Sequence, residues 1–213
     1  MADPTDRLRL VQWLSPAFPI GAFAYSQGLE VAISDGDVRT AQDLEAWIAA
    51  ILRHGSGRID AILLAHARQA QADLAGLTAL ILALAPSAER VTELQEQGRA
   101  FALAISSITE VDHPPRPYPI AVGAATAPLR VSTAEVLTLW LQGLAAQLTS
   151  AAVRFVPLGQ TDGQMVLARL APRITALAAE YTEAPLSALH SSTLRADIAA
   201  MRHETLPVRI FRT

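Results

Sequence analysis

The sequence predicts an all-α fold, a single-domain bundle of about eight to ten helices around one core. Hydrophobic residues make up 51% of the 213 residues, and the excess is mostly Ala and Leu, which are good helix formers. Apolar residues recur at helical spacing along most of the chain. The alternation of apolar and polar residues that marks a half-buried strand is nowhere sustained.

The clearest helix lies between Thr40 and Gly55. Its apolar residues follow the i, i+3, i+4, i+7, i+8 spacing of one buried face, with Thr40 as the N-cap candidate and Gly55 as the stop signal. Similar spacing predicts further helices over residues 59–70, 74–85, 87–108, 132–155, 161–181 and 194–203.

Local signals place several helix ends. Ser87 is a cap candidate, and Ser132 with Glu135 and Thr161 with Gln164 match the capping box. Pro172 predicts a break or kink in its helix.

Four prolines within residues 112–119 exclude a helix interior there. The segment is either an interdomain linker or a rigid loop, and we favour the loop because both halves of the chain share one composition. We therefore expect one domain over residues 1–213, with flexible residues at 1–6 and in the tail, 204–213.

Composition narrows the function classes. The formal net charge is −3, which does not indicate a nucleic-acid surface. There is no cysteine, and all 17 basic residues are arginine, so a phosphate-loop lysine is excluded. The longest apolar run, 74–85, is too short to span a bilayer, and no targeting segment is evident. These features predict a cytoplasmic protein that binds neither nucleic acid nor membrane.

No catalytic or metal motif is complete. His203–Glu204 begins a zinc-protease pattern, but Pro207 stands where the second histidine belongs. The five histidines are dispersed, and the "AYSQG" around Ser26 lacks the first glycine of a nucleophile elbow. We therefore predict no enzyme activity, no metal site and no cofactor bound by the chain itself.

Three irregular stretches remain: residues 15–30, 157–164 and 201–213. The first holds prolines, glycines and aromatic residues, and the last holds arginines around Ile210 and Phe211, a composition typical of interface anchors. A frayed terminus is the alternative for the last stretch. The second, "PLGQTDGQ", is either an anion-holding turn or, as we favour, a tight turn before a helix.

These stretches resemble the urease accessory protein F family. The first stretch carries the family pattern Ser-Pro-x-x-Pro-[Val/Ile]-Gly-x-Phe-x-Tyr-Ser-x-Gly-Leu-Glu. The second stretch carries the complete family motif Pro-Leu-Gly-Gln-Thr-Asp-Gly-Gln. The third carries Met-Arg-His-Glu-Thr and then Arg-Ile-Phe-Arg-Thr. They occur in the family's order and span nearly the whole chain. Ala22 and Ala24 stand where glycine and serine are frequent, and "LPV" at 206–208 replaces a more polar connection.

The resemblance implies an all-α, non-catalytic scaffold and chaperone that forms homodimers. It implies binding to urease accessory protein D, called H in some organisms, with the tail packed against that partner. The pair would recruit urease accessory protein G, a nickel-carrying GTPase, and deliver nickel to apo-urease as GTP is hydrolysed. Nickel, GTP and magnesium would be handled by the complex. The alternatives are a direct nickel carrier and a small helical enzyme with an unrecognised site.

Pro16 and Pro19 would stiffen the first stretch so that Phe18, Phe23 and Tyr25 are displayed to a partner at low entropic cost. The alternative is that these aromatics cover the bundle. In the tail, we expect Phe211 to act as a partner anchor and deletion of Arg209–Thr213 to leave helical content nearly unchanged. The predicted partner-binding residues are Pro16, Phe18, Pro19, Phe23, Tyr25, Ser26, Glu30, Gly159, Gln160, Arg202, His203, Glu204, Arg209, Phe211 and Arg212.

Overall fold

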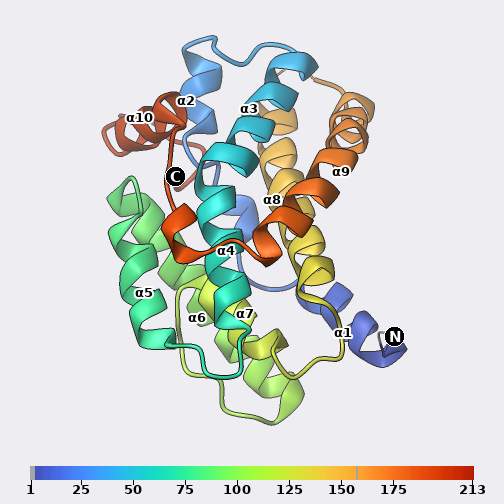
Figure 1. Cartoon of the computed structure of the whole chain (residues 1–213). Coiled ribbons are helices and arrows are strands. Elements are labelled where there is room, and N and C mark those ends of the chain that lie inside the picture. The colour runs from blue at the N-terminus through green and yellow to red at the C-terminus, as the bar shows by residue number, and fades with distance from the viewer. Residues whose placement is uncertain (1–2, 157) are drawn as a thin grey trace.

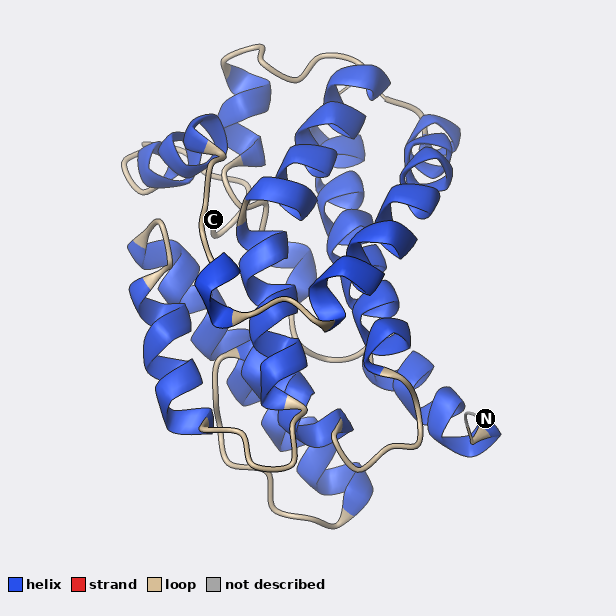
Figure 2. Cartoon of the chain, in the orientation of Figure 1, coloured by secondary structure: helices blue, strands red, loops and turns tan. Residues whose placement is uncertain are grey.

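The structure, a computed structural model, describes residues 3–156 and 158–213, and it confirms the all-α prediction (Figures 1 and 2). No strand occurs among the described residues. The α-helices are α1 (Pro4–Trp13), α2 (Leu29–Ser34), α3 (Ala41–His54), α4 (Ser56–Ala67), α5 (Leu74–Ala83), α6 (Ala88–Thr109), α7 (Tyr118–Thr126), α8 (Thr133–Phe155), α9 (Gln160–Thr182) and α10 (Leu194–His203). Two 3-10 turns, Ala22–Ala24 and Leu186–Ala188, complete the elements.

Most predicted caps are confirmed. The Thr40 hydroxyl accepts a hydrogen bond from the Asp43 amide at 3.2 Å, and the Asp43 carboxylate accepts one from the Thr40 amide at 3.0 Å. Ser87 and Ser132 cap α6 and α8 by accepting hydrogen bonds from the amides of Arg90 and Glu135. The predicted Ser132–Glu135 capping box is only half formed, because the Glu135 carboxylate pairs with Arg7 instead of the Ser132 amide. Each bond satisfies an amide that the first helical turn would otherwise leave unpaired.

The start of α9 differs from the prediction. Its N-cap is Gly159, whose amide donates to the Asp162 carboxylate at 3.0 Å, so the proposed Thr161–Gln164 capping box is wrong. Thr161 lies inside the helix. The helix also continues past Pro172 to Thr182 without a break. Pro172 lies on the exposed face, where water can bond the carbonyl that proline leaves unpaired.

Three helices were not predicted: α1, α2 and α7. The start of the chain, expected to be flexible over 1–6, is helical from Pro4, and the Asp3 carboxylate caps it by accepting from the Thr5 amide at 2.8 Å. Residues 1–2 lie outside the described residues. Helix α7 begins directly after the proline-rich loop and has Pro119 in its first turn, where a missing amide costs nothing.

Helix α8 lies at the centre of the fold. It packs most extensively on α9 and also contacts α2, α3 and α4 (Figure 1). It is long and apolar enough to cross a membrane by length and composition, but its core positions, including Leu137, Leu141 and Leu148, are inaccessible to water. Its hydrophobicity is therefore that of a core helix.

The main core draws residues from both sides of the proline-rich loop, from Leu10 to Phe211. A smaller apolar cluster joins α4, α5, α6 and α7 around Leu63 and Ile81. The loop itself passes close to α6 at Gly98, where an added Cβ would lie 1.8 Å from the Arg116 carbonyl oxygen. The loop is thus packed onto the core rather than standing between two separate cores.

Candidate functional site

The tail folds back onto the first irregular stretch. The Ser26 amide donates to the Thr213 carbonyl at 3.0 Å, and the Ser26 hydroxyl donates to the same oxygen. The Arg212 amide donates to the Ala24 carbonyl at 2.7 Å. Two segments almost the whole chain apart in sequence therefore lie side by side.

A group of three side chains, which we call the tail clamp, holds this arrangement: Glu30 on α2, Glu89 on α6 and His203 on α10. The Glu30 carboxylate accepts from the amides of Ile210 and Phe211 at 2.9 and 3.0 Å. The His203 ring lies between the two carboxylates, with Nε2 at 3.1 Å from Glu30 and Nδ1 at 2.7 Å from Glu89. His203 is fully buried.

The Phe211 ring is buried, with 5% of the residue exposed. The Arg154 guanidinium lies 4.8 Å from the ring centroid and donates to the Phe23 carbonyl at 2.8 Å. Arg154 thus joins the tail to the 3-10 turn at Ala22–Ala24. This aromatic–cation contact adds to the apolar burial that keeps the tail in place.

Tyr25 forms a second link to the tail. Its hydroxyl donates to Glu96 at 2.6 Å, and Arg212 pairs with the same carboxylate at 2.7 Å. Burial, reinforced by the Glu96 carboxylate, raises the pKa of the Tyr25 phenol well above its usual value. The hydrogen bond from Tyr25 lowers the pKa of Glu96, so the carboxylate stays charged and available to Arg212.

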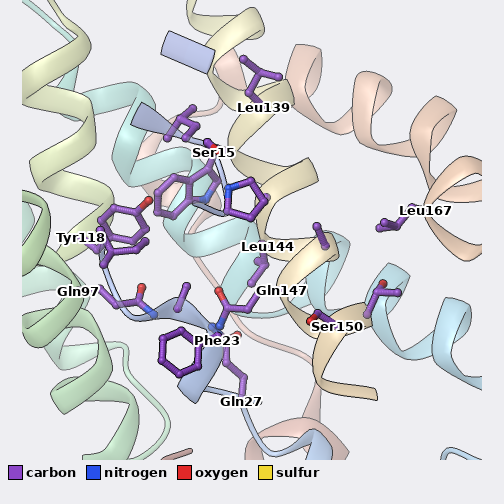
Figure 3. Close-up of a pocket in the computed structure, with 18 of the residues that line it drawn as sticks. Ser15, Phe23, Gln27, Gln97, Tyr118, Leu139, Leu144, Gln147, Ser150 and Leu167 are labelled. Atoms are coloured by element: carbon purple, nitrogen blue, oxygen red, sulfur yellow. The ribbon is translucent and has the colours of Figure 1, made fainter. Parts of the chain in front are cut away.

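Beside this region lies a cavity of about 310 Å³ between the first stretch, α6, α8 and the start of α9 (Figure 3). Phe23 and Gln27 line one part of it, Tyr118 and Trp140 another, and Gln160 contributes from α9. The cavity therefore brings the first and second irregular stretches together.

A buried ionic cluster of Asp60, Arg90 and Glu93 also lines the cavity. Arg90 pairs with both carboxylates, at 2.7 Å from Glu93. Burial raises the pKa of Asp60 to about 6, because desolvation outweighs the attraction of Arg90 and the Glu93 charge adds to it. One cation facing two carboxylates leaves an excess of negative charge that a proton on Asp60 can cancel.

The predicted partner-binding residues separate into two sets. The buried set is Phe18, Tyr25, Ser26, Glu30, His203 and Phe211, and the exposed set is Pro16, Pro19, Phe23, Gly159, Gln160, Arg202, Glu204, Arg209 and Arg212. Whether any of them contacts a partner stays a prediction.

The expectation that the three aromatics are displayed is wrong for Phe18 and Tyr25, which cover the bundle. Phe18 packs on the Phe101 ring with centroids 5.5 Å apart. Phe23 alone of the three is exposed. The structure likewise places Phe211 inside its own chain, since Arg154 and the tail clamp fix it there. Deletion of Arg209–Thr213 would remove these contacts, and the expectation that it leaves helical content nearly unchanged stays a prediction.

The second stretch is a turn leading into α9. Gly159 and Gln160 are exposed at its start, and the Leu158 amide donates to the Val156 carbonyl at 2.7 Å. Pro157 lies outside the described residues. This geometry fits the tight-turn interpretation.

Sequence reasoning missed the partners of the tail: Glu89, Glu96 and Arg154. All three are polar residues on long helices, where the pattern indicates ordinary solvated positions. Glu204, in contrast, was predicted, and its carboxylate accepts from the Ala88 amide at 2.7 Å at the start of α6.

Within residues 3–156 and 158–213, no group of three His, Asp or Glu side chains is arranged to hold a metal ion.

In this all-α bundle the first and second irregular stretches meet at a cavity, and the third, the tail, docks beside them. A family model described as UreF matches residues 38–171. A protein from Cereibacter sphaeroides (strain ATCC 17023) named "Urease accessory protein UreF" is 61% identical over 206 residues, which cover 97% of this chain and 98% of that protein. Proteins of the same name from Jannaschia sp. (strain CCS1) and Paracoccus denitrificans (strain Pd 1222) are each 48% identical, over 97% of this chain and 94% and 96% of those proteins. The chain belongs to the UreF family.

Proposed function

We propose that this chain is a cytoplasmic urease maturation factor that works as a non-catalytic scaffold. It binds urease accessory protein D (H), and the pair recruits the GTPase, urease accessory protein G. The assembly then inserts nickel into apo-urease as GTP is hydrolysed. The observation that carries this proposal is an apolar surface at α10 and the tail that its own chain leaves uncovered.

Helix α10 presents one part of that surface. Leu194, Ile198 and Met201 are exposed and stand at i, i+4 and i+7, so they share one face of the helix. The opposite face, with Ala199, Ala200 and His203, is buried. An exposed apolar stripe opposite a buried one is typical of a helix that packs on a second partner.

The tail presents the other part. Val208 is 81% exposed and Ile210 is 65% exposed, whereas the neighbouring Phe211 is buried. The tail therefore has one part that packs on its own chain, at Phe211, and another that stays exposed, at Val208 and Ile210. The proposed anchors therefore shift from Phe211 to Val208 and Ile210.

Arginines surround these apolar side chains. Each of these arginines pairs with a carboxylate of its own chain but leaves much of its side chain exposed; they are Arg195 and Arg202 on α10 and Arg209 and Arg212 in the tail. Arginine forms bidentate hydrogen bonds to carboxylates and is common in interfaces. We infer that the matching surface of the D-type partner is apolar at its centre and acidic at its rim.

The remaining parts of the proposal rest on the family. We propose that two copies associate, that the chain itself binds no nickel or nucleotide, and that both are handled by the assembled complex. Light scattering tests the first point, because a stable 22.7 kDa species at micromolar concentration would contradict a homodimer. Equilibrium dialysis with nickel tests the second, and a tight stoichiometric site would contradict it.

The experiment that tests the function uses a urease-producing host that lacks its own F-type gene. Expression of this chain with an affinity tag should restore urease activity and should co-purify the D-type and G-type accessory proteins. The host should carry the urease, D-type and G-type genes from the same operon as this chain. In such a host, failure to restore urease activity would contradict the proposal. Restored activity without any co-purified accessory protein would contradict it as well.

A further inference from the structure

His203 has an environment that its role in docking the tail does not require. Both ring nitrogens face a carboxylate oxygen, Nε2 at 3.1 Å from Glu30 and Nδ1 at 2.7 Å from Glu89. A neutral imidazole carries one N–H, so it can donate only one of these two hydrogen bonds. Both bonds form only when both nitrogens carry a proton, that is, when the ring is an imidazolium.

Charge balance at the site favours the same state. The groups that face His203 are Glu30 from α2, Glu89 from α6 and, through Glu89, Arg209 from the tail. With an imidazolium, these two carboxylates and two cations sum to zero. His203 also lies at the C-terminal end of α10, where the helix dipole favours a positive charge.

The other charged groups nearby are engaged elsewhere. Arg202 on α10 pairs with Asp35 at the end of α2, and the Glu204 carboxylate accepts from the amides at the start of α6. Arg90, next to Glu89 in sequence, pairs with Asp60 and Glu93. None of these provides a second cation that could replace the charge of His203 between the two carboxylates.

Loss of the His203 proton affects the tail because Glu30 contacts both the His203 ring and the tail amides. The Glu30 oxygen that faces Nε2 also accepts from the Phe211 amide at 3.0 Å, and the other oxygen accepts from the Ile210 amide. When His203 is neutral, one nitrogen presents a lone pair to a carboxylate oxygen, and the two repel. Because burial excludes water from this contact, Glu30 or Glu89 must move. Movement of Glu30 removes the acceptor of the tail amides, and movement of Glu89 disrupts its ion pair with Arg209 in the tail.

We propose that His203 is a proton-gated latch: its protonated form holds the tail docked, and its neutral form releases it. The docked state binds one more proton than the released state, so docking is favoured at lower pH and weakens as pH rises.

The test is amide hydrogen exchange of the full chain between about pH 6 and about pH 9, a range that begins near the ordinary pKa of a free histidine side chain and extends well above it. Protection factors, which correct for the intrinsic pH dependence of exchange, are compared for Ile210, Phe211 and Arg212 and for a reference amide. Leu129 serves as the reference, because its amide donates to the Thr126 carbonyl in a turn that has no link to the clamp. We expect the tail protection factors to fall about tenfold to hundredfold relative to Leu129 as pH rises, the effect of losing one charge-assisted hydrogen bond.

Two variants separate the latch from general pH effects. His203→Gln, which has no titrating ring, should show weak tail protection that no longer changes with pH, while circular dichroism remains helical. His190→Gln, a change at an exposed histidine outside the clamp, should keep the wild-type pH profile.

Two results would overturn the proposal. One is a wild-type tail whose protection factors do not change with pH over this range. The other is a pH dependence of tail protection that remains in His203→Gln. If His203→Gln does not fold, nitrogen-15 NMR of the wild-type His203 ring tests the proposal, because it reports the protonation state of the ring at each pH. Loss of one ring proton in step with loss of tail protection supports the latch, and a ring that stays in one protonation state while the tail is released contradicts it.

Discussion

Replacing Phe211 with alanine is expected to destabilise the whole protein, because the structure places its ring in the core of its own chain. Phe211 is 5% exposed. Truncating a buried phenylalanine costs about 3–5 kcal/mol, through lost transfer free energy and the cavity left behind. We expect the lower end, about 3 kcal/mol, because one face of the ring is covered by Arg154, whose long side chain can move into the space. In a chain of 213 residues each kcal/mol lowers the melting temperature by about 2–4 °C, which gives about 6–12 °C.

Urea and thermal unfolding followed by circular dichroism measure this effect. The matched control is Ile210→Ala, which changes the neighbouring residue of the same tail. Ile210 is 65% exposed, so the control should alter the free energy of unfolding by no more than about 0.5 kcal/mol. Equal stability of the two variants would refute the reasoning, because it would mean that the tail is not packed on its own chain.

Three further predictions concern the interior. Arg90→Met leaves Asp60 and Glu93 buried without their shared cation, so we expect a loss of about 3–5 kcal/mol in urea unfolding, and a loss below about 1 kcal/mol would contradict the ionic cluster. Because burial raises the pKa of Asp60 from 3.8 to about 6, the folded state holds its proton more tightly than the unfolded state, and the contribution of Asp60 to stability falls as pH rises through this interval. Asp60→Asn should therefore remove that part of the slope in a plot of unfolding free energy against pH, and an unchanged slope would count against it. Gly98→Ala should lower the melting temperature markedly, since its Cβ would meet the Arg116 carbonyl at 1.8 Å, and a melting temperature equal to the wild type would show that the loop does not pack so closely.

The helices with strong local signals could be predicted from the sequence. Thr40, Ser87 and Ser132 cap their helices as expected, because an N-cap hydrogen bond spans only three residues. Helix α1 was missed although Asp3 and Pro4 form a start signal, because its apolar residues are few. Helix α7 was missed because the prolines before it suggested a loop that continues through Tyr118.

The docked tail could not be predicted, because nothing local determines it. Whether Phe211 is buried depends on Glu30 and Arg154, which lie far from it in sequence and reach it only after α2, α8 and α10 have packed together. The composition of the tail fits both an anchor for a partner and an anchor to its own chain. In the structure Phe211 is buried in its own chain and Ile210 is exposed, so Phe211 anchors the tail to its own chain and Ile210 is the proposed anchor for a partner.

The central claim is that the outward side of α10 and the tail binds the D-type accessory protein, and one titration tests it most directly. The purified D-type protein is titrated onto immobilised wild-type chain, Ile210→Glu and Leu103→Glu. Leu103, on α6, is 73% exposed and lies outside the proposed surface, so its variant adds the same charge at a similarly exposed apolar position. A charged side chain at an anchor should cost 2 kcal/mol or more, so we expect the dissociation constant of Ile210→Glu to rise by about thirtyfold or more while Leu103→Glu binds like the wild type. Unaltered affinity of Ile210→Glu, or equal losses in both variants, would contradict the account.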